Sequence, residues 1–571
     1  MKSLFAKQKS KANLQRNAFD LSYSNKFTAS PGMLLPCYVQ EVNPNEHFVI
    51  SPQSFLRTMP LNTASFVRAK QNIEFYFVPY RLLCRQFPQF VVGTEYKISS
   101  LSGLNDYKNP LPTFDLSVIV STLAALCKNN NNDLDIAGMP IWRGAVRLLD
   151  LLGYGVNLPS LRAISKDFAT SPFDKTLSVN PLRLLAYQKI YYDFYRNPMY
   201  ELNNPDAYNI DGLFDSGSLS VPDFTSYTTG PSNNQMFVLR YRNWKKDYFN
   251  CVSPYFQGAD WLSDAVSSPI LGYDIQGTSN LKPFTSSDIN SGIAQSFMYN
   301  NHPSGNTSAF SIANLRSAYA LDKLYRLSIA AGDGDYGSQI RAHYGFDVPY
   351  DNCKSRFIGG ISEPISISEV ITTATTADAP TGDIYGKGLS ANSGQRIVFD
   401  TKEHGIIMGI FSVVPEADYN ANGVDKFNMK INREDYYQPE FADLGLAPLS
   451  LYEYAYCAPW NRSDDNRTLG YIPRYAEYKT RVDYVHGEFE SYTEQSSGEN
   501  GKLSAWVAPR QTQLSGQLGA SNAFFKIKPN IWNNITSLAF KGKEEEDIFI
   551  VDFRANVQAV RPMSVSGLPS L

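Results

Sequence analysis

The sequence predicts a mainly β fold, in which antiparallel strands lie near both ends of the chain and helices and loops are inserted between them. In the stretch QNIEFYFVPY, the apolar residues Ile73, Phe75 and Phe77 alternate with Asn72, Glu74 and Tyr76 on the opposite side, and a proline closes the run. Such alternation is typical of a half-buried strand, because successive side chains point to opposite faces of a sheet.

Two further strands are predicted in the last third of the chain. Every second residue over 549–557 is apolar, with Asp552 and Arg554 between them, and this pattern predicts a half-buried antiparallel strand. The stretch HGIIMGIFSVV, which begins at His404, has apolar residues at both odd and even positions and therefore predicts a strand covered on both faces. The charged run 543–547 before the last strand predicts a solvated turn.

Helices are predicted in the middle of the chain. Asn180 followed by Pro181 is typical of a helix start, and apolar residues then share one face over 182–190. A second helix is predicted from about Ser311, with its apolar residues, Leu324 among them, on one side.

The composition indicates a large chain that covers much of its surface with neighbours. Its 571 residues exceed what one hydrophobic core usually supports, so several domains or large insertions are expected. Only 19% of the residues are charged, against about 25% in a typical soluble domain. The 36 tyrosines and 34 phenylalanines supply contact area at little entropic cost.

Basic residues concentrate at the start of the chain, although the net charge of −3 gives no global nucleic-acid signal. Five of them precede the first acid, Asp20: Lys2, Lys7, Lys9, Lys11 and Arg16. Charge alone leaves a solvated terminus and a phosphate-binding arm equally open. No apolar run has the length of a secretory signal or of a membrane span, so no membrane insertion is expected.

Local motifs for catalysis or metal binding are absent from the sequence. The six cysteines include no C-x-x-C pair, and the five histidines form no H-E-x-x-H motif. The cysteines are therefore expected to be buried thiols in a reducing compartment, and no catalytic residue, metal site or cofactor is predicted. A triad assembled from distant residues stays open.

The run GDGDYG, at 332–337, resembles a phosphate-binding or calcium-binding loop only superficially. A helix precedes it where a nucleotide loop needs a strand, and Ser338 and Tyr344 stand where a calcium loop needs glycine and glutamate. It is interpreted as a glycine turn that stops one helix at Gly332 and introduces the next at about Gly337.

The segment 315–370 resembles part of the major capsid proteins of microviruses, small icosahedral phages with circular single-stranded DNA. Its features are a helix that begins with Leu315 and Arg316, the glycine turn, Phe346 in a loop, and a Gly-Gly pair at 359–360 before the next strand. The stretches FVPYRLL, DFYRNP, NWKKDYFNCVSPYFQG and LGYIPRYAEYKTRVDYVHGEF, and the N-terminal region, resemble other parts of that family in the same order. The tracts 201–240 and 258–310 align with nothing.

This resemblance implies a single eight-stranded antiparallel viral jelly roll in two facing sheets, with long helical and loop insertions. It divides the chain into a basic N-terminal arm at 1–20, jelly-roll strands with loops at 21–120 and 350–571, a helical insertion at 121–200, variable surface insertions at 201–310 and a helical segment at 311–349. Within the variable tract, which is rich in Ser, Thr, Asn, Gly and Pro, residues 258–310 are the candidate for a threefold surface projection like that of gokushoviruses.

The resemblance also implies a structural protein, not an enzyme, of which sixty copies assemble into a T=1 icosahedral shell around the genome. The basic arm would then contact genome phosphates inside the shell, and the projection would contact a receptor on the host surface. Small DNA-binding or scaffolding phage proteins are further candidate partners. The expected location is the virion, assembled in the bacterial cytoplasm.

Two other classes of protein stay open at the level of the sequence. A secreted carbohydrate-active β-sandwich enzyme would use an acidic pair such as Asp464 and Asp465. A surface adhesin is the second alternative, against which the missing export signal argues.

Overall fold

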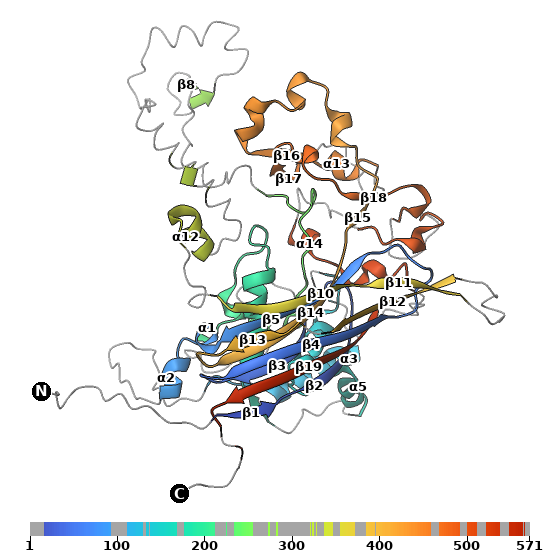
Figure 1. Cartoon of the computed structure of the whole chain (residues 1–571). Helices are drawn as coiled ribbons and strands as arrows, with labels where there is room; N and C mark the ends of the chain where they lie inside the picture. Colours follow the sequence, from blue (N-terminus) through green and yellow to red (C-terminus); the bar gives the residue numbers. More distant parts are fainter. Residues whose placement is uncertain are drawn as a thin grey trace, which may run out of the picture.

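Two antiparallel sheets lie face to face at the centre of the computed structural model (Figure 1). The larger sheet has seven strands in the order β1-β19-β4-β12-β11, with β2 also paired to β19 and β13 also paired to β4. The smaller sheet has four strands in the order β10-β5-β14-β3. The chain is therefore mainly β with antiparallel sheets, as predicted.

The strands of the larger sheet are β1 (Asn17–Asp20), β2 (Tyr23–Ala29), β4 (His47–Thr58), β11 (Ser366–Ile371), β12 (Ile384–Ser393), β13 (Ile397–Asp400) and β19 (Phe549–Arg561). Those of the smaller sheet are β3 (Leu35–Val42), β5 (Ala69–Pro79), β10 (Arg356–Pro364) and β14 (Gly405–Pro415). Shorter pairs are β6 (Phe114–Asp115) with β7 (Ser178–Val179), β8 (Gly272–Asp274) with β9 (Leu281–Pro283), β15 (Asp418–Asn420) with β18 (Asp483–Val485), and β16 (Leu446–Ser450) with β17 (Thr468–Pro473).

The α-helices in the described part of the chain are α1 (Tyr80–Leu83), α2 (Phe87–Val92), α3 (Leu116–Asn129), α4 (Ile141–Leu151), α5 (Leu158–Asp167), α6 (Leu182–Ile190), α12 (Tyr336–Tyr344), α13 (Leu451–Ala455) and α14 (Asn522–Phe525). The structure describes residues 16–92, 111–129, 133–167 except 136, 176–211, 224, 233–254, 272–274, 281–283, 320, 323, 324, 327, 336–346, 354–371, 384–457 except 394, 468–491, 500–510, 521–536 and 547–565 except 564.

Strands β19 and β14 confirm the two predictions made for the last third of the chain. In β19 every second side chain from Phe549 to Ala559 is buried, and the residues between them are exposed or half-buried. This strand pairs with β4 along its length, from Phe549 opposite Thr58 to Val560 opposite His47. The side chains on both faces of strand β14 are buried, because the strand lies between β3 and β5 and is covered by helix α6.

Strand β5 is only partly as predicted. Ile73, Phe75 and Phe77 are buried, but Tyr76, which was expected on the more exposed side, is also buried. A π-helical turn that follows α6 covers it, with the Phe194 ring 4.6 Å from the Tyr76 ring. The prediction of a half-buried strand is therefore wrong for the second half of β5.

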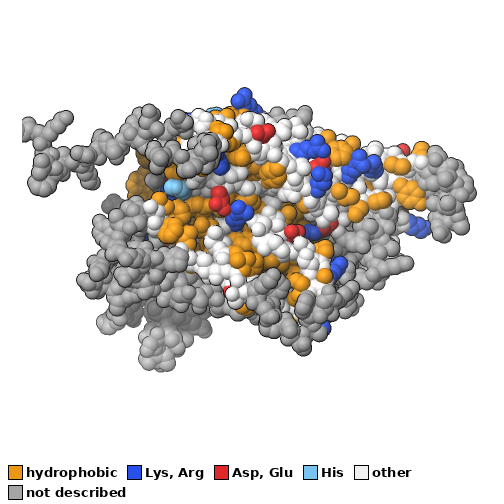
Figure 2. All heavy atoms as spheres, turned by 90° about the horizontal axis from the view of Figure 1, so that it is seen from below, with side chains coloured by type: hydrophobic (Ala, Val, Ile, Leu, Met, Phe, Trp, Pro, Cys, Tyr) orange, Lys and Arg blue, Asp and Glu red, His pale blue; other side chains and the backbone are white. Residues whose placement is uncertain are grey.

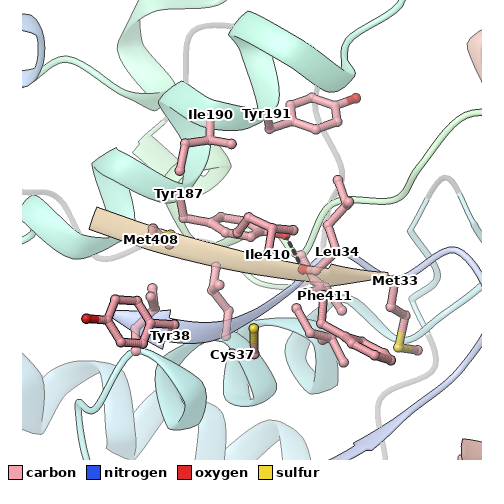
Figure 3. Close-up of a cluster of buried hydrophobic side chains, with 14 of the residues drawn as sticks. Met33, Leu34, Cys37, Tyr38, Tyr187, Ile190, Tyr191, Met408, Ile410 and Phe411 are labelled. Carbon is pink, nitrogen blue, oxygen red and sulfur yellow. Dashed lines mark hydrogen bonds between the residues drawn. The ribbon is translucent and has the colours of Figure 1, made fainter. Parts of the chain in front are cut away.

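Helix α6 begins where the sequence predicts, because the Asn180 side chain accepts a hydrogen bond from the Leu182 N–H at 3.3 Å. The helix is nevertheless buried on nearly all sides, and not only on the predicted apolar face. It lies between the smaller sheet and residues 233–241. Its polar groups are satisfied there: Tyr187 donates to the Leu34 carbonyl at 2.8 Å (Figure 3), and Gln188 donates to the Val238 carbonyl at 2.8 Å.

The Gly-Gly pair at 359–360 lies inside strand β10, and not before it as the resemblance implies. The register of β10 against β5 shifts between Phe357 and Gly359, where Gly359 has a φ of +152° that favours glycine. A Cβ on Gly360 would lie 2.9 Å from the Ile73 carbonyl oxygen. The two glycines therefore permit a bulge and a close strand approach.

Three other expectations change. The charged run before β19 was predicted to be solvated, but Asp547 is largely buried in an ion pair with Arg147 of α4. Among the described cysteines Cys37 and Cys84 are buried, whereas Cys457 is exposed. Residues 233–254, which the sequence assigns to variable surface insertions, contribute a run of buried side chains to the hydrophobic cores.

Of the helix predicted from Ser311, most residues and Gly332 lie outside the described residues. Leu324, which was placed on its apolar face, is 48% exposed. Helix α12 begins at Tyr336, within one residue of the predicted start.

A second, smaller hydrophobic core lies in an outer lobe above the sheets (Figure 1). The outer lobe consists of the described residues of 245–253, 416–491 and 521–525. Short 3₁₀ turns and two-stranded pairs build it, in place of long strands. Its core is mainly aromatic and includes Phe249, Tyr419, Phe524 and Phe525.

Candidate genome-facing and subunit-contact surfaces

The root of the predicted basic arm lies at an edge of the seven-stranded sheet. Of the five predicted arm residues, Arg16 is described, and Lys2, Lys7, Lys9 and Lys11 lie outside the described residues. The Arg16 Nη2 atom donates to the Asn45 carbonyl at 2.8 Å. Residues 17–20, which the sequence assigns to the arm, form strand β1 and pair with the end of β19.

A buried ion pair fixes this corner of the sheet. Arg561 at the end of β19 lies 3.4 Å from a carboxylate oxygen of Glu46, whose side chain is fully buried. The Arg561 guanidinium also lies over the Phe48 ring and donates to the Glu41 carbonyl at 3.1 Å. Arg561 therefore links the end of β19 to β3 and to the start of β4. The sequence could not reveal this pair, because its members lie at opposite ends of the chain.

An exposed aromatic surface lies on the outer lobe. It consists of five residues that are each between 41% and 86% exposed: Phe427, Ile431, Tyr436, Tyr437 and Tyr478. Asp435 fixes the backbone that carries them, because its side chain accepts from the Ile431 N–H at 3.0 Å and from the Asn432 N–H at 2.7 Å. Ile431, the most exposed of the five, is therefore held by a rigid turn.

Lys430 supports the aromatic surface from beneath. Its ammonium group donates to Glu477 at 2.7 Å and lies 4.2 Å from the centre of the Tyr478 ring and 4.8 Å from that of Phe427. Burial lowers the pKa of Lys430, but the hydrogen bonds to Glu477 and Tyr478 outweigh this effect and raise the pKa above its usual value. The cation therefore stays charged and orders the rings.

Exposed apolar rings on a rigid support are typical of a protein contact surface. Sequence reasoning missed this surface, because its residues follow neither the strand nor the helix period. The overall abundance of tyrosine was the one available signal.

Within the described residues, no group of three His, Cys, Asp or Glu side chains could hold a metal ion. His47 and Asp400, whose atoms Nδ1 and Oδ1 are 2.7 Å apart, form an isolated pair between β4 and β13. No helix in the described part of the chain is long and apolar enough to span a membrane. The acidic pair Asp464 and Asp465 lies outside the described residues.

The sheet fold and the exposed candidate contact surfaces fit a structural protein of a virus shell, and a family comparison decides the question. The family model for capsid protein (F protein) matches residues 8–136 and 162–571. The chain belongs to this family of phage capsid proteins. It is therefore a structural protein of the virion and not an enzyme, so the alternative of a carbohydrate-active enzyme is wrong. The resemblance to the microvirus capsid proteins is confirmed.

Individual relatives are similar to this chain over nearly its whole length in two cases and over about half of it in a third. Capsid protein VP1 of Chlamydia phage 1 is 24% identical over 98% of this chain and 96% of its own length. Capsid protein VP1 of Bdellovibrio phage phiMH2K is 22% identical over 97% and 95%. Capsid protein VP1 of Spiroplasma virus 4 is 26% identical over 47% of this chain and 46% of its own length.

Proposed function

We propose that this chain is the major capsid protein of a microvirus-like phage, and that sixty copies form a T=1 shell around a circular single-stranded DNA genome. The observation that carries this proposal is the order of strands in the two sheets, considered together with the membership of the capsid family. Assembly takes place in the bacterial cytoplasm, with small DNA-binding or scaffolding phage proteins as further partners.

The strand order supports a single eight-stranded jelly roll. Strands β1 and β2 share one position beside β19, and β12 and β13 share one beside β4, so that eight positions remain when β11 is set apart as an extension. Along the chain, position 1 is β1 with β2, position 2 is β3, position 3 is β4, position 4 is β5, position 5 is β10, position 6 is β12 with β13, position 7 is β14 and position 8 is β19. In these numbers the larger sheet has the order 1-8-3-6 and the smaller sheet the order 2-7-4-5. Positions 1 and 8, 2 and 7, 3 and 6, and 4 and 5 are neighbours, as in one long hairpin rolled up on itself.

The exposed aromatic surface is proposed as one of the contacts between copies. A closed shell needs heterologous contacts, in which a patch on one copy of the chain meets a different patch on the next copy. Rigid, exposed rings give contact area without a large loss of side-chain entropy. The tract 258–310 is proposed as the surface projection that contacts the host. Of that tract, the structure describes the pair β8 and β9, with Gly272 opposite Pro283.

The basic arm, with Lys2, Lys7, Lys9, Lys11 and Arg16, is proposed to bind genome phosphates inside the shell. Its root at Arg16 is held at the end of β1, so that the charges on residues 2–11 start from a fixed point of the sheet. Such binding does not depend on base sequence and weakens as salt concentration rises.

One experiment tests assembly and the arm together. The full chain is expressed with the phage genome, and particles are examined by electron microscopy and light scattering. We expect uniform particles of about 3.8 MDa, from sixty copies of a 63.9-kDa chain, and roughly 25–30 nm across. Changing the four arm lysines to glutamine should leave particles intact but lower their DNA content at least twofold.

The matched control removes the same charge elsewhere, by changing four exposed lysines to glutamine: Lys245, Lys246, Lys479 and Lys502. Its DNA content should equal that of the unchanged chain. If no closed particles form under any condition, the shell proposal fails. If the arm variant packages as much DNA as the control, the arm has no role in holding the genome.

A further inference from the structure

Within the part of the chain that the structure describes, the outward side chains of the seven-stranded sheet are accessible to solvent on β19 and its neighbours. In β19 the inward residue Phe553 is fully buried, whereas the outward residues Ile550 and Arg554 are accessible. The Arg554 side chain is 61% exposed. The main contacts of the described helices with the two central sheets are made to the smaller one, through β3, β5 and β14, and Arg147 of α4 reaches the larger sheet at Asp547, beside the start of β19. A large, flat strand surface therefore lacks a cover from those helices.

The strand register gathers cations on one half of this face. We name this half the basic sheet face and define it by its outward side chains: Lys26, Gln53, Phe55, Arg57, Lys387, Leu389, Ile550, Asp552 and Arg554. Across the strands, Lys26 lies opposite Asp552 and Asp552 opposite Phe55. In the next row Ile550 lies opposite Arg57, and Arg57 opposite Leu389. Lys387 projects on the same side as Leu389, two residues along β12.

The charge of the basic sheet face is strongly positive for a protein with net charge −3. Four cations, Lys26, Arg57, Lys387 and Arg554, stand against the carboxylate of Asp552, which leaves a local charge of +3. Asp552 lies 3.8 Å from the Lys26 ammonium and 3.1 Å from the Arg554 guanidinium. Seen from below, Lys and Arg side chains gather toward the end where the molecule narrows, with hydrophobic side chains between them and few acidic ones (Figure 2).

A flat stacking group lies among these charges. The Arg57 guanidinium lies over the half-buried Phe55 ring, 4.9 Å from its centre. An unpaired base can stack on such a group whatever its identity, because every base has a π face. Gln53, between Arg554 and the end of β12, adds an uncharged hydrogen-bonding group. Spaced cations around a ring are the chemistry that recognises a single-stranded nucleic acid.

We propose that the basic sheet face is a binding platform for single-stranded DNA, in which the four cations contact phosphates and Phe55 with Arg57 stacks a base. The proposal rests on the proposed function, because it takes the packaged genome as the ligand. Charge excludes the chain's own arm as the occupant, since the arm is also basic. The arm root at Arg16 lies on the same sheet, at its other end, so arm and platform can hold one DNA strand between them.

The test measures binding of the unassembled full chain to a fluorescent twenty-residue oligothymidine, by anisotropy at several salt concentrations. Changing Lys26, Arg57 and Arg554 together to glutamine should weaken binding at least tenfold near 50 mM salt. It should also reduce the slope of log affinity against log salt by about 2, since each lost phosphate contact on a single strand contributes about 0.7. Changing Lys245, Lys246 and Lys479 to glutamine is the control and should change neither value.

Two single substitutions separate stacking from charge. Phe55→Leu keeps an apolar side chain and should weaken binding at least fivefold without altering the salt slope. Asp552→Asn releases Lys26 and Arg554 and should tighten binding at least twofold. Unchanged affinity in the triple variant, with folding verified by circular dichroism, would overturn the platform.

The same variants are also assayed for particle formation, which keeps the two proposals distinguishable. Particles that form normally while oligonucleotide binding is lost support the platform. If the triple variant binds the oligonucleotide normally but forms no particles, the face is instead a contact between copies, and the platform is refuted. Failure of the unchanged chain to form particles would count against the shell alone, because the binding assay uses unassembled protein.

Discussion

The two hydrophobic cores of this chain are built by different means. The core between the sheets consists of strand residues such as Phe553 and Val551, which are buried because alternate side chains of β19 point inward. The core of the outer lobe is mainly aromatic, and its backbone is irregular. A buried arginine lies at its edge. Arg510 donates to the Phe524 carbonyl and the Asn250 side chain, and to the Tyr419 hydroxyl at 3.2 Å.

This difference shows which interactions fix the backbone in each region. In the sandwich, main-chain pairing satisfies the backbone and leaves the side chains free to pack. In the outer lobe, side chains must satisfy the backbone as well, which gives polar groups such as Asp435 and Arg510 a structural role. The sandwich should therefore be sensitive to lost volume, and the lobe to lost hydrogen bonds.

The largest effect is expected in the sandwich. Phe553→Ala should cost about 3–5 kcal/mol of stability, because it leaves a cavity beneath β19. Hydrogen exchange should rise in both β19 and β4, and particle yield should fall. Ile550→Ala, on the outward side of the same strand, is the matched control and should cost less than about 1 kcal/mol. Equal losses from the two variants would show that burial does not control this strand.

An intermediate effect is expected in the lobe. Arg510→Met keeps much of the side-chain volume but leaves the Phe524 carbonyl and Asn250 without their donor, at a cost of about 2–3 kcal/mol. Hydrogen exchange should rise around residues 245–253 and 521–525, while β4 and β19 keep their protection. Loss of protection throughout the molecule would mean that the two cores unfold as one unit.

The smallest effect is expected at the clamp between α4 and the larger sheet, and it should depend on pH. Asp547 accepts hydrogen bonds from Arg147 at 2.9 Å and from Ser30 at 3.1 Å. Burial raises the pKa of Asp547, but Arg147 and the hydroxyls of Thr28 and Ser30 outweigh it and hold the pKa below its usual value.

Because the folded-state pKa is lowered, the clamp stabilises the protein above the unfolded pKa of about 4 and loses this effect as pH falls through the folded pKa. Asp547→Asn should therefore lower the melting temperature at pH 7 by a few degrees. The difference in melting temperature between the variant and the unchanged chain should shrink below pH 4 and disappear as pH falls through the folded pKa of Asp547. A constant difference between pH 7 and pH 3 would contradict the assignment.

The sequence predicted the parts of the fold that repeat. Strand β19 was identified from its period-two alternation of apolar residues, β14 from a continuous apolar run, and the start of α6 because Asn180 caps it. The burial of Tyr76 could not be predicted, since it depends on a π-helical turn that comes from more than one hundred residues further along the chain. The pairs Glu46–Arg561 and Arg147–Asp547 likewise join residues whose proximity only the completed sheets create.

The candidate surfaces show the same limit. The basic arm is visible in the sequence because its charges are contiguous. The basic sheet face is not, because Lys26, Arg57 and Arg554 come from three strands, and a register is needed to align them. The exposed aromatic surface depends on 3₁₀ turns, which are too short to leave a repeating pattern.

The closure of β1 against the end of β19 has a practical consequence for engineering. The Asn17 side chain donates to the Met563 carbonyl at 2.7 Å, so that the start of β1 and the end of β19 meet at one point. A short peptide linking these two positions would make the chain circular without bending the sheet. New ends could then be opened in a surface loop elsewhere, which would turn a different face of the same fold into the attachment point for cargo or labels.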